Sequence, residues 1–167
     1  MKRKTKFTVN PALCGLALIV WLLLTSSAVV VLPMGRLVSA LVFFVLGLAF
    51  LTVAVRNGIS VEVGTDGLHR SIFGRELSFL PWEKVKEVGV CGVRPFHAKD
   101  AKNTGTLYIY FSEIHMNDEE RFDMVLKWPP RDKVYFVHDL DRLKTVQYRW
   151  GGKIECYNTG AYKIGQI

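Results

Sequence analysis

Hydrophobic and polar positions follow two different patterns along this chain of 167 residues. Residues 12–32 and 37–55 are apolar runs without a charged residue, whereas residues 57–167 contain short alternating stretches separated by turn-forming residues. An α-helix rises about 1.5 Å per residue, so helices over the two runs would be roughly 28 to 32 Å long, which matches the hydrocarbon core of a bilayer. The first third of the chain is therefore predicted to form two transmembrane helices.

Only residues 33–36, with the sequence PMGR, separate the two runs. Proline and glycine are typical of a tight turn, so an antiparallel helical hairpin is expected. In a first alternative the runs are core helices of a soluble protein, although such helices normally keep a polar stripe. In a second, residues 1–28 are a secretory signal, because a basic start precedes an apolar run and Ser26-Ser27-Ala28 resembles a cleavage site.

Beyond residue 57, period-two alternation predicts a β-rich domain. Residues 59–63 form the first predicted strand, and GTDG at residues 64–67 supplies a hairpin turn. Residues 68–73 and 76–80 form the next two strands, on either side of a Gly74-Arg75 turn. Further strands are predicted near residues 86–93, 106–112, 134–138 and 153–157, and residues 94–104 are predicted to be a loop.

Helix signals are concentrated near the C-terminus. Asp139 is a good N-cap, Gly151-Gly152 is a good stop, and the apolar residues between them recur along one side of a helix. The pattern over residues 113–133 is weaker. Asn117 or Asp118 is the expected cap of a short helix through Leu126, and Trp128-Pro129-Pro130 ends any regular element.

The stretch ISVEVGTDGLHRSIFGRELSFLPWEKVKEV, residues 59–88, combines three strands, a DG turn, a glycine-containing turn and a Pro-Trp-x-x-Val phrase. With the preceding hairpin, it resembles the membrane-anchored bacterial PH-like domain proteins. The resemblance implies an α+β fold: a transmembrane hairpin in residues 1–56, then a PH-like half-barrel of two antiparallel sheets with a C-terminal helix in residues 57–167. PH domains that bind phosphoinositides place basic residues around the first hairpin turn, whereas residues 64–67 contain an aspartate and no base.

Charge is divided unequally between the two regions. The net charge is +7, but all 15 acidic residues lie in residues 57–167 with 16 of the 22 basic ones, so this region is nearly neutral and nucleic acid is not an expected partner. Basic residues flank the outer ends of the predicted hairpin, whereas Arg36 alone lies in its turn. The positive-inside rule then predicts a multi-pass protein of the bacterial cell membrane with both termini in the cytoplasm.

No catalytic, cofactor or metal site is predicted. The chain lacks GxSxG, GxxxxGK[ST] and GxGxxG motifs, and its cysteines have no CxxC spacing. The acidic residues 118–120, and the pair Asp139 and Asp141, are explained by helix starts. The four histidines lie in different predicted elements: His69, His97, His115 and His138.

A β-rich module without a catalytic constellation predicts a non-catalytic membrane protein that docks a protein or peptide partner. The alternative is a module that senses lipid headgroups or membrane stress through a basic C-terminal surface, and a membrane-bound enzyme is the third candidate. Tyr108 and Tyr110 are expected on the face of their strand opposite Leu107, Ile109 and Phe111. The candidate contact residues for a partner or lipid are Arg70, Arg75, Tyr108, Tyr110, Arg142, Arg149 and Lys153.

Overall fold

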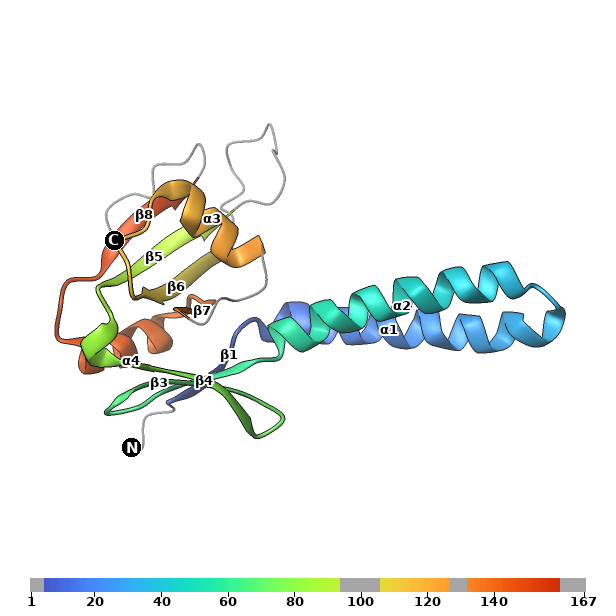
Figure 1. The fold of residues 1–167 in the computed structure, drawn as a ribbon, viewed down its shortest axis with the longest axis horizontal. Helices are drawn as coiled ribbons and strands as arrows, with labels where there is room; N and C mark the ends of the chain where they lie inside the picture. The colour runs from blue at the N-terminus through green and yellow to red at the C-terminus, as the bar shows by residue number, and fades with distance from the viewer. Residues whose placement is uncertain (1–4, 94–105, 127–131, 160–167) are drawn as a thin grey trace. The chain divides into compact units, whose positions relative to one another are not determined.

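The computed structural model describes residues 5–93, 106–126 and 132–159. The chain divides into two compact units, of which one is residues 10–59 and the other combines residues 1–9 with residues 60–167 (Figure 1). The hairpin is thus inserted into the β-rich unit rather than placed before it. The predicted loop at residues 94–104 and the Trp128-Pro129-Pro130 stop lie outside the described residues.

The smaller unit is the predicted helical hairpin. Helix α1 (Pro11–Val31) begins at Asn10, whose side chain accepts a hydrogen bond from Leu13 N, and helix α2 (Leu37–Asn57) follows the short 3-10 helix η1 (Leu32–Met34). Both are long and apolar enough to cross a membrane. Small residues let the helices approach closely, as transmembrane helices commonly do. The buried residues of the two helices are Ala17, Ala28, Ala40, Gly47 and Ala54.

The first sheet has the strand order β1-β2-β3-β4, and every neighbouring pair is antiparallel. Its strands are β1 (Lys6–Thr8), β2 (Ser60–Val63), β3 (Gly67–Ile72) and β4 (Arg75–Pro81). The last three are the predicted meander, but its second turn lies at Phe73-Gly74 and not at Gly74-Arg75, because Arg75 already pairs with Ile72. Strand β1 was not predicted, and the predicted domain boundary after residue 56 assigned its residues to the hairpin region. Its three residues carry a single apolar side chain, Phe7, which is too little for an alternation signal but is buried.

The second sheet has the strand order β7-β6-β5-β8. Its strands are β5 (Glu87–Val93), β6 (Thr106–Ser112), β7 (Lys133–Val137) and β8 (Glu155–Thr159). Strand β8 runs parallel to β5, so this sheet is mixed, and the expectation of two antiparallel sheets is corrected. The reason is the length of the connection. A tight turn makes consecutive strands antiparallel, whereas helix α4 (Leu140–Trp150), between β7 and β8 in the chain, is a crossover long enough for parallel pairing.

Both predicted helices of this unit are present. Helix α3 (Asp118–Leu126) begins with a capping box, in which Asn117 Oδ1 accepts from Glu120 N and Glu120 Oε2 accepts from Asn117 N, each at 2.9 Å. Helix α4 is capped by Asp139, which accepts from Asp141 N, and ends at Gly151 in the left-handed region. A 3-10 helix, η2 (Trp82–Lys84), connects β4 to β5.

The core lies between the inner faces of the two sheets, and a second layer lies between the second sheet and α3 (Figure 1). Tyr110, Phe111 and Phe136 are among the largest fully buried side chains. Contacts that link the sheets include two hydrogen bonds, from Val137 N to Val9 O at 2.7 Å and from Arg70 Nη1 to Lys133 O at 3.3 Å. The described residues thus form an α+β unit of two facing sheets rather than a closed barrel.

Candidate functional site

A groove runs along β4, which is an end strand of its sheet in the described part of the chain. Its volume is about 370 Å³, and its lining residues are Leu77, Ser78, Phe79, Glu113 and Asp132. The first three belong to β4, and the two acidic residues come from the segments that follow β6 and precede β7. A backbone hydrogen bond of 3.1 Å, from Glu113 N to Asp132 O, holds the acidic side of the groove together.

The groove combines apolar side chains with carboxylates. Leu77 and Phe79 are 44% and 42% exposed, and Phe79 stacks on His69 with a ring separation of 4.5 Å. Asp132 is also partly exposed, and its carboxylate lies 4.0 Å from Lys133 Nζ. Apolar and anionic surfaces side by side favour a ligand with both apolar and cationic groups.

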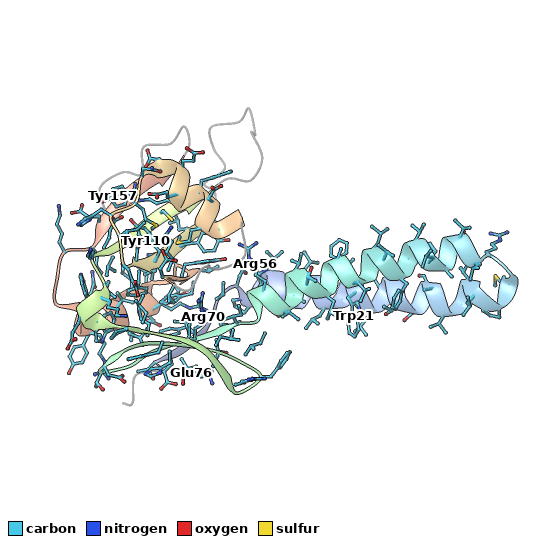
Figure 2. All side chains as sticks on the ribbon, viewed as in Figure 1. Trp21, Arg56, Arg70, Glu76, Tyr110 and Tyr157 are labelled. Atoms are coloured by element: carbon cyan, nitrogen blue, oxygen red, sulfur yellow. The ribbon has the colours of Figure 1, made fainter. Side chains whose placement is uncertain are left out.

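Arg70 joins the groove strand to the second sheet. Its Nε donates to Ser78 Oγ at 2.9 Å and its Nη1 to Lys133 O, so the guanidinium lies between the two sheets (Figure 2). Burial lowers the pKa of Arg70. The side chain is only 4% exposed, and therefore its role here is to hold Ser78 and the start of β7 in place.

A buried polar cluster lies under α3, on the other side of the second sheet. Glu87 Oε1 accepts from Arg121 Nη2 at 2.9 Å and from the Tyr110 hydroxyl, while Glu87 Oε2 accepts from Met116 N at 3.0 Å. Arg121 Nε in turn donates to the Tyr110 oxygen at 3.0 Å. The guanidinium carbon lies 3.3 Å from the ring centroid of Tyr157 on β8, and Figure 2 shows Tyr110 and Tyr157 close together.

The electrostatics of this cluster favour a structural role. Burial by itself raises the pKa of Glu87, but the hydrogen bonds from Tyr110, Arg121 and the Met116 amide outweigh it, and the pKa lies below its usual value. Burial and the bond to Glu87 both raise the pKa of Tyr110. A carboxylate that is ionised and surrounded by donors is a poor proton carrier at neutral pH, so the cluster fixes α3 to the second sheet.

Three of the predicted contact residues are buried. Arg70 is 4%, Tyr108 7% and Tyr110 0% exposed, so these side chains lie inside the β-rich unit, and their contact with a partner stays a prediction. On β6, the Tyr110 hydroxyl accepts a hydrogen bond from Arg121 of α3, so this tyrosine faces a helix of the same unit. The sheet is covered on both faces, and strict alternation of buried and exposed positions does not apply.

The remaining four predicted residues are distributed over β4, α4 and the segment before β8. Arg75 is exposed at the start of β4. Arg142 is half-buried and donates to Thr8 O and Val137 O, at 3.2 and 3.0 Å, so it fastens β1 to the second sheet. Arg149 lies over the Tyr148 ring, and Lys153 pairs with Glu155 at 2.7 Å. A contact of these four with a partner stays a prediction.

Sequence reasoning missed Glu87 and Arg121. The helix pattern contained one usable signal: Arg121 and Met124 are three residues apart on α3, so they share a face, and Met124 is buried. Nothing local identified Glu87 as the partner of Arg121, since the two residues are 34 positions apart. The groove had no local signal either, because one side comes from β4 and the other from Glu113 and Asp132, which are far from β4 in the sequence.

Among the described residues, no group of three histidine, cysteine or acidic side chains is arranged to hold a metal ion. His69 lies between Asp66 and Glu76, at 3.3 and 3.2 Å; burial lowers its pKa, but these carboxylates outweigh burial and the net shift is upward. The fourth histidine, His97, lies outside the described residues.

Burial raises the pKa of the Cys91 thiol to about 12, so this cysteine is a weak nucleophile.

Comparisons with protein-family models, with curated proteins and with solved structures found no match for this chain.

Proposed function

We propose that this protein is a membrane-anchored docking module, in which the helical hairpin spans a bacterial cell membrane and a cytoplasmic PH-like half-barrel binds a protein or peptide partner. The observation that carries the proposal is the groove along β4. This groove joins an edge strand to exposed apolar side chains and two carboxylates. Two facing sheets with a helix after β7 support the PH-like part of the proposal.

The exposed surface of the hairpin supports membrane anchoring. Large apolar side chains point outward along both helices, for example Leu23 at 64% and Val38 at 76% exposure. In water, each square ångström of such surface is unfavourable by about 25 cal/mol, whereas lipid tails accept it. The core helix of a soluble protein buries this surface, so the alternative of a soluble protein has less support.

The strand pairing supports a topology in which both outer ends of the hairpin lie on the same side of the membrane. Thr8, which precedes α1, pairs with Ser60, which follows α2. The two outer ends of the hairpin therefore lead into the same sheet, as required if the helices cross the bilayer once in each direction. The basic residues near these ends favour the cytoplasmic side.

The groove suits an extended peptide that adds a strand to the sheet. An edge strand offers backbone donors and acceptors for such a peptide, and pockets beside it select side chains. Here Leu77 and Phe79 offer apolar contacts, and Glu113 and Asp132 favour a basic side chain at a neighbouring position. We expect the partner to present an extended segment with alternating apolar and basic residues.

Site-specific photo-crosslinking in the membranes of the native cell tests the proposal. A photoreactive phenylalanine derivative is placed at Phe79 in the groove and, as a matched control, at Tyr148, which is 71% exposed on α4. We expect a discrete crosslinked product from position 79 that is absent from position 148. Equal labelling from both positions, or no product from position 79, would argue against docking in the groove.

The lipid-headgroup alternative has weaker support. Arg142 donates to two backbone carbonyls and Lys153 pairs with Glu155, so these basic residues already have partners within the unit. If the basic C-terminal region did bind lipid headgroups, binding of the protein to lipid vesicles would increase with the anionic lipid content of the vesicles.

A further inference from the structure

The turn between β3 and β4 presents a phenylalanine to the surroundings. Phe73 is 93% exposed, and it has a φ of 48°, while the following Gly74 has a φ of 81°. Ile72 and Arg75 pair across these two residues, so they form a two-residue hairpin turn with both residues in the left-handed region.

Phenylalanine is an unfavourable choice for this turn in water. Asparagine, aspartate and glycine are the residues that adopt left-handed backbone most readily, whereas a phenylalanine is strained there. An aromatic ring that is almost fully exposed also leaves its apolar surface in water. Neither the backbone nor the packing of the unit therefore explains why Phe73 is present.

The turn between β3 and β4 lies at the end of the first sheet to which the helical hairpin is connected. Strand β3 is antiparallel to β2 with Ser71 opposite Ser60, and Thr8 of β1 is also opposite Ser60. The sheet end that carries Phe73 is thus the end at which the chain enters and leaves the hairpin. Only two residues separate Asn57, the last residue of α2, from Ser60, so the Cα atoms of Asn57 and Ser60 lie at most about 11 Å apart.

We infer that Phe73 inserts into the lipid interface, with the exposed Arg75 beside it close to anionic headgroup phosphates. This inference rests on the proposed membrane anchoring, because a hairpin that spans the bilayer keeps the sheet end with Thr8 and Ser60 near the membrane surface. Aromatic side chains are enriched at that interface, and basic residues near it gain from anionic lipid. In lipid the exposed ring of Phe73 becomes favourable.

The contact has a consequence for the docking groove. Leu77 and Phe79 follow Phe73 along β4, and a strand extends by about 3.3 Å per residue. A membrane-bound turn therefore keeps the groove within about 20 Å of the interface. The partner segment that suits this position is one that lies close to the membrane surface.

Spin labelling of the full-length protein in vesicles of phosphatidylcholine and phosphatidylglycerol tests the inference. Nitroxide labels are attached to F73C, to T65C in the exposed turn at the opposite end of β3, and to L46C within α2. Cys14 and Cys156 are replaced by serine, and Cys91 is fully buried. The measured quantity is the ratio of collisions with oxygen, which enriches in lipid, to collisions with a water-soluble nickel chelate.

We expect ratios several-fold higher at positions 73 and 46 than at position 65. A low ratio at position 73 together with a high ratio at position 46 would overturn the lipid contact and leave the membrane anchor intact. Low ratios at all three positions would overturn the anchor and the lipid contact together.

Discussion

The Glu87 carboxylate shows how single residues hold this fold together. It receives hydrogen bonds from Tyr110, Arg121 and the Met116 amide, and each partner comes from a different element or segment. A buried charge is tolerated only when it is paired and hydrogen-bonded, and removal of one partner leaves the other uncompensated. The stability of the β-rich unit is therefore expected to depend on the ionisation of Glu87.

Acid should weaken the unit through Glu87. The folded-state pKa of this carboxyl lies below its ordinary value of 4.5, so its contribution to stability is complete above that value and is lost as the pH falls through the folded-state pKa. Arg121 and Tyr110 face this carboxylate, and His115 Nδ1 lies 3.4 Å from it.

Urea unfolding of the wild type and Glu87→Gln in detergent, between about pH 7 and about pH 3, measures this contribution. The difference in unfolding free energy should be largest near neutral pH and should shrink below 4.5. Glu83→Gln, at an exposed position on η2, is the control and should leave the pH dependence unchanged. A difference that stays constant down to the lowest pH would contradict the argument.

Phe73→Asn should stabilise the β-rich unit. Asparagine accepts left-handed backbone more readily than phenylalanine, and the change should raise the unfolding free energy in detergent by about 1 kcal/mol. Phe73→Ala is the matched control, because it removes the ring but keeps a residue that is unfavourable at positive φ. An equal gain for both variants would assign the effect to the ring instead of the backbone.

Strand β1 is only three residues long, but it connects the first sheet to the second. It adds an edge to the first sheet, and its neighbour Val9 accepts a hydrogen bond from Val137 of the second sheet. Arg142 strengthens the same connection by donating to Thr8 O. The segment before the hairpin is therefore a structural part of the unit that follows the hairpin.

Phe7→Ala should cost about 3 kcal/mol of unfolding free energy, as is typical of a buried phenylalanine. The Phe7 ring packs against Phe136, with 5.4 Å between the centroids. Lys6→Ala, at the exposed neighbouring position, should have little effect. Chemical denaturation of both variants checks the prediction, and a loss for Phe7→Ala below about 1 kcal/mol would show that β1 is dispensable.

In the whole molecule, the hairpin is inserted between two paired strands, and this insertion constrains the membrane topology that we propose. Because β1 and β2 are neighbours in one sheet, the two outer ends of the hairpin belong to one folded unit. For a membrane-spanning hairpin, the turn at Gly35-Arg36 then lies across the bilayer from that unit.

Labelling with a membrane-impermeant maleimide in sealed vesicles checks this topology. Cys156, which is exposed in the β-rich unit, and a cysteine introduced by Arg36→Cys should react from opposite sides of the membrane. A cysteine introduced by Lys6→Cys should react from the same side as Cys156. Reaction of positions 36 and 156 from one side would rule out a spanning hairpin.

Local sequence patterns predicted the elements that depend on local physics. A charge-free run of about 20 residues favours a helix of membrane length, alternation favours a strand, and Asp139 with Gly151 marks both ends of α4. The predicted helices, the meander and α3 were confirmed for these reasons. Each of these signals lies within a few residues of the structure that it specifies.

Which elements meet depends on long-range packing, which local patterns do not encode. The pairing of β1 with β2, the parallel direction of β8, the covering of Tyr110 and the bond from Arg70 to Lys133 all join distant parts of the chain. Arg70 and Lys133 are 63 positions apart, and no local pattern encodes such a partner. Local patterns thus account for the two apolar helices and most strands, whereas the groove, the buried Glu87 cluster and the position of Phe73 arise from long-range packing.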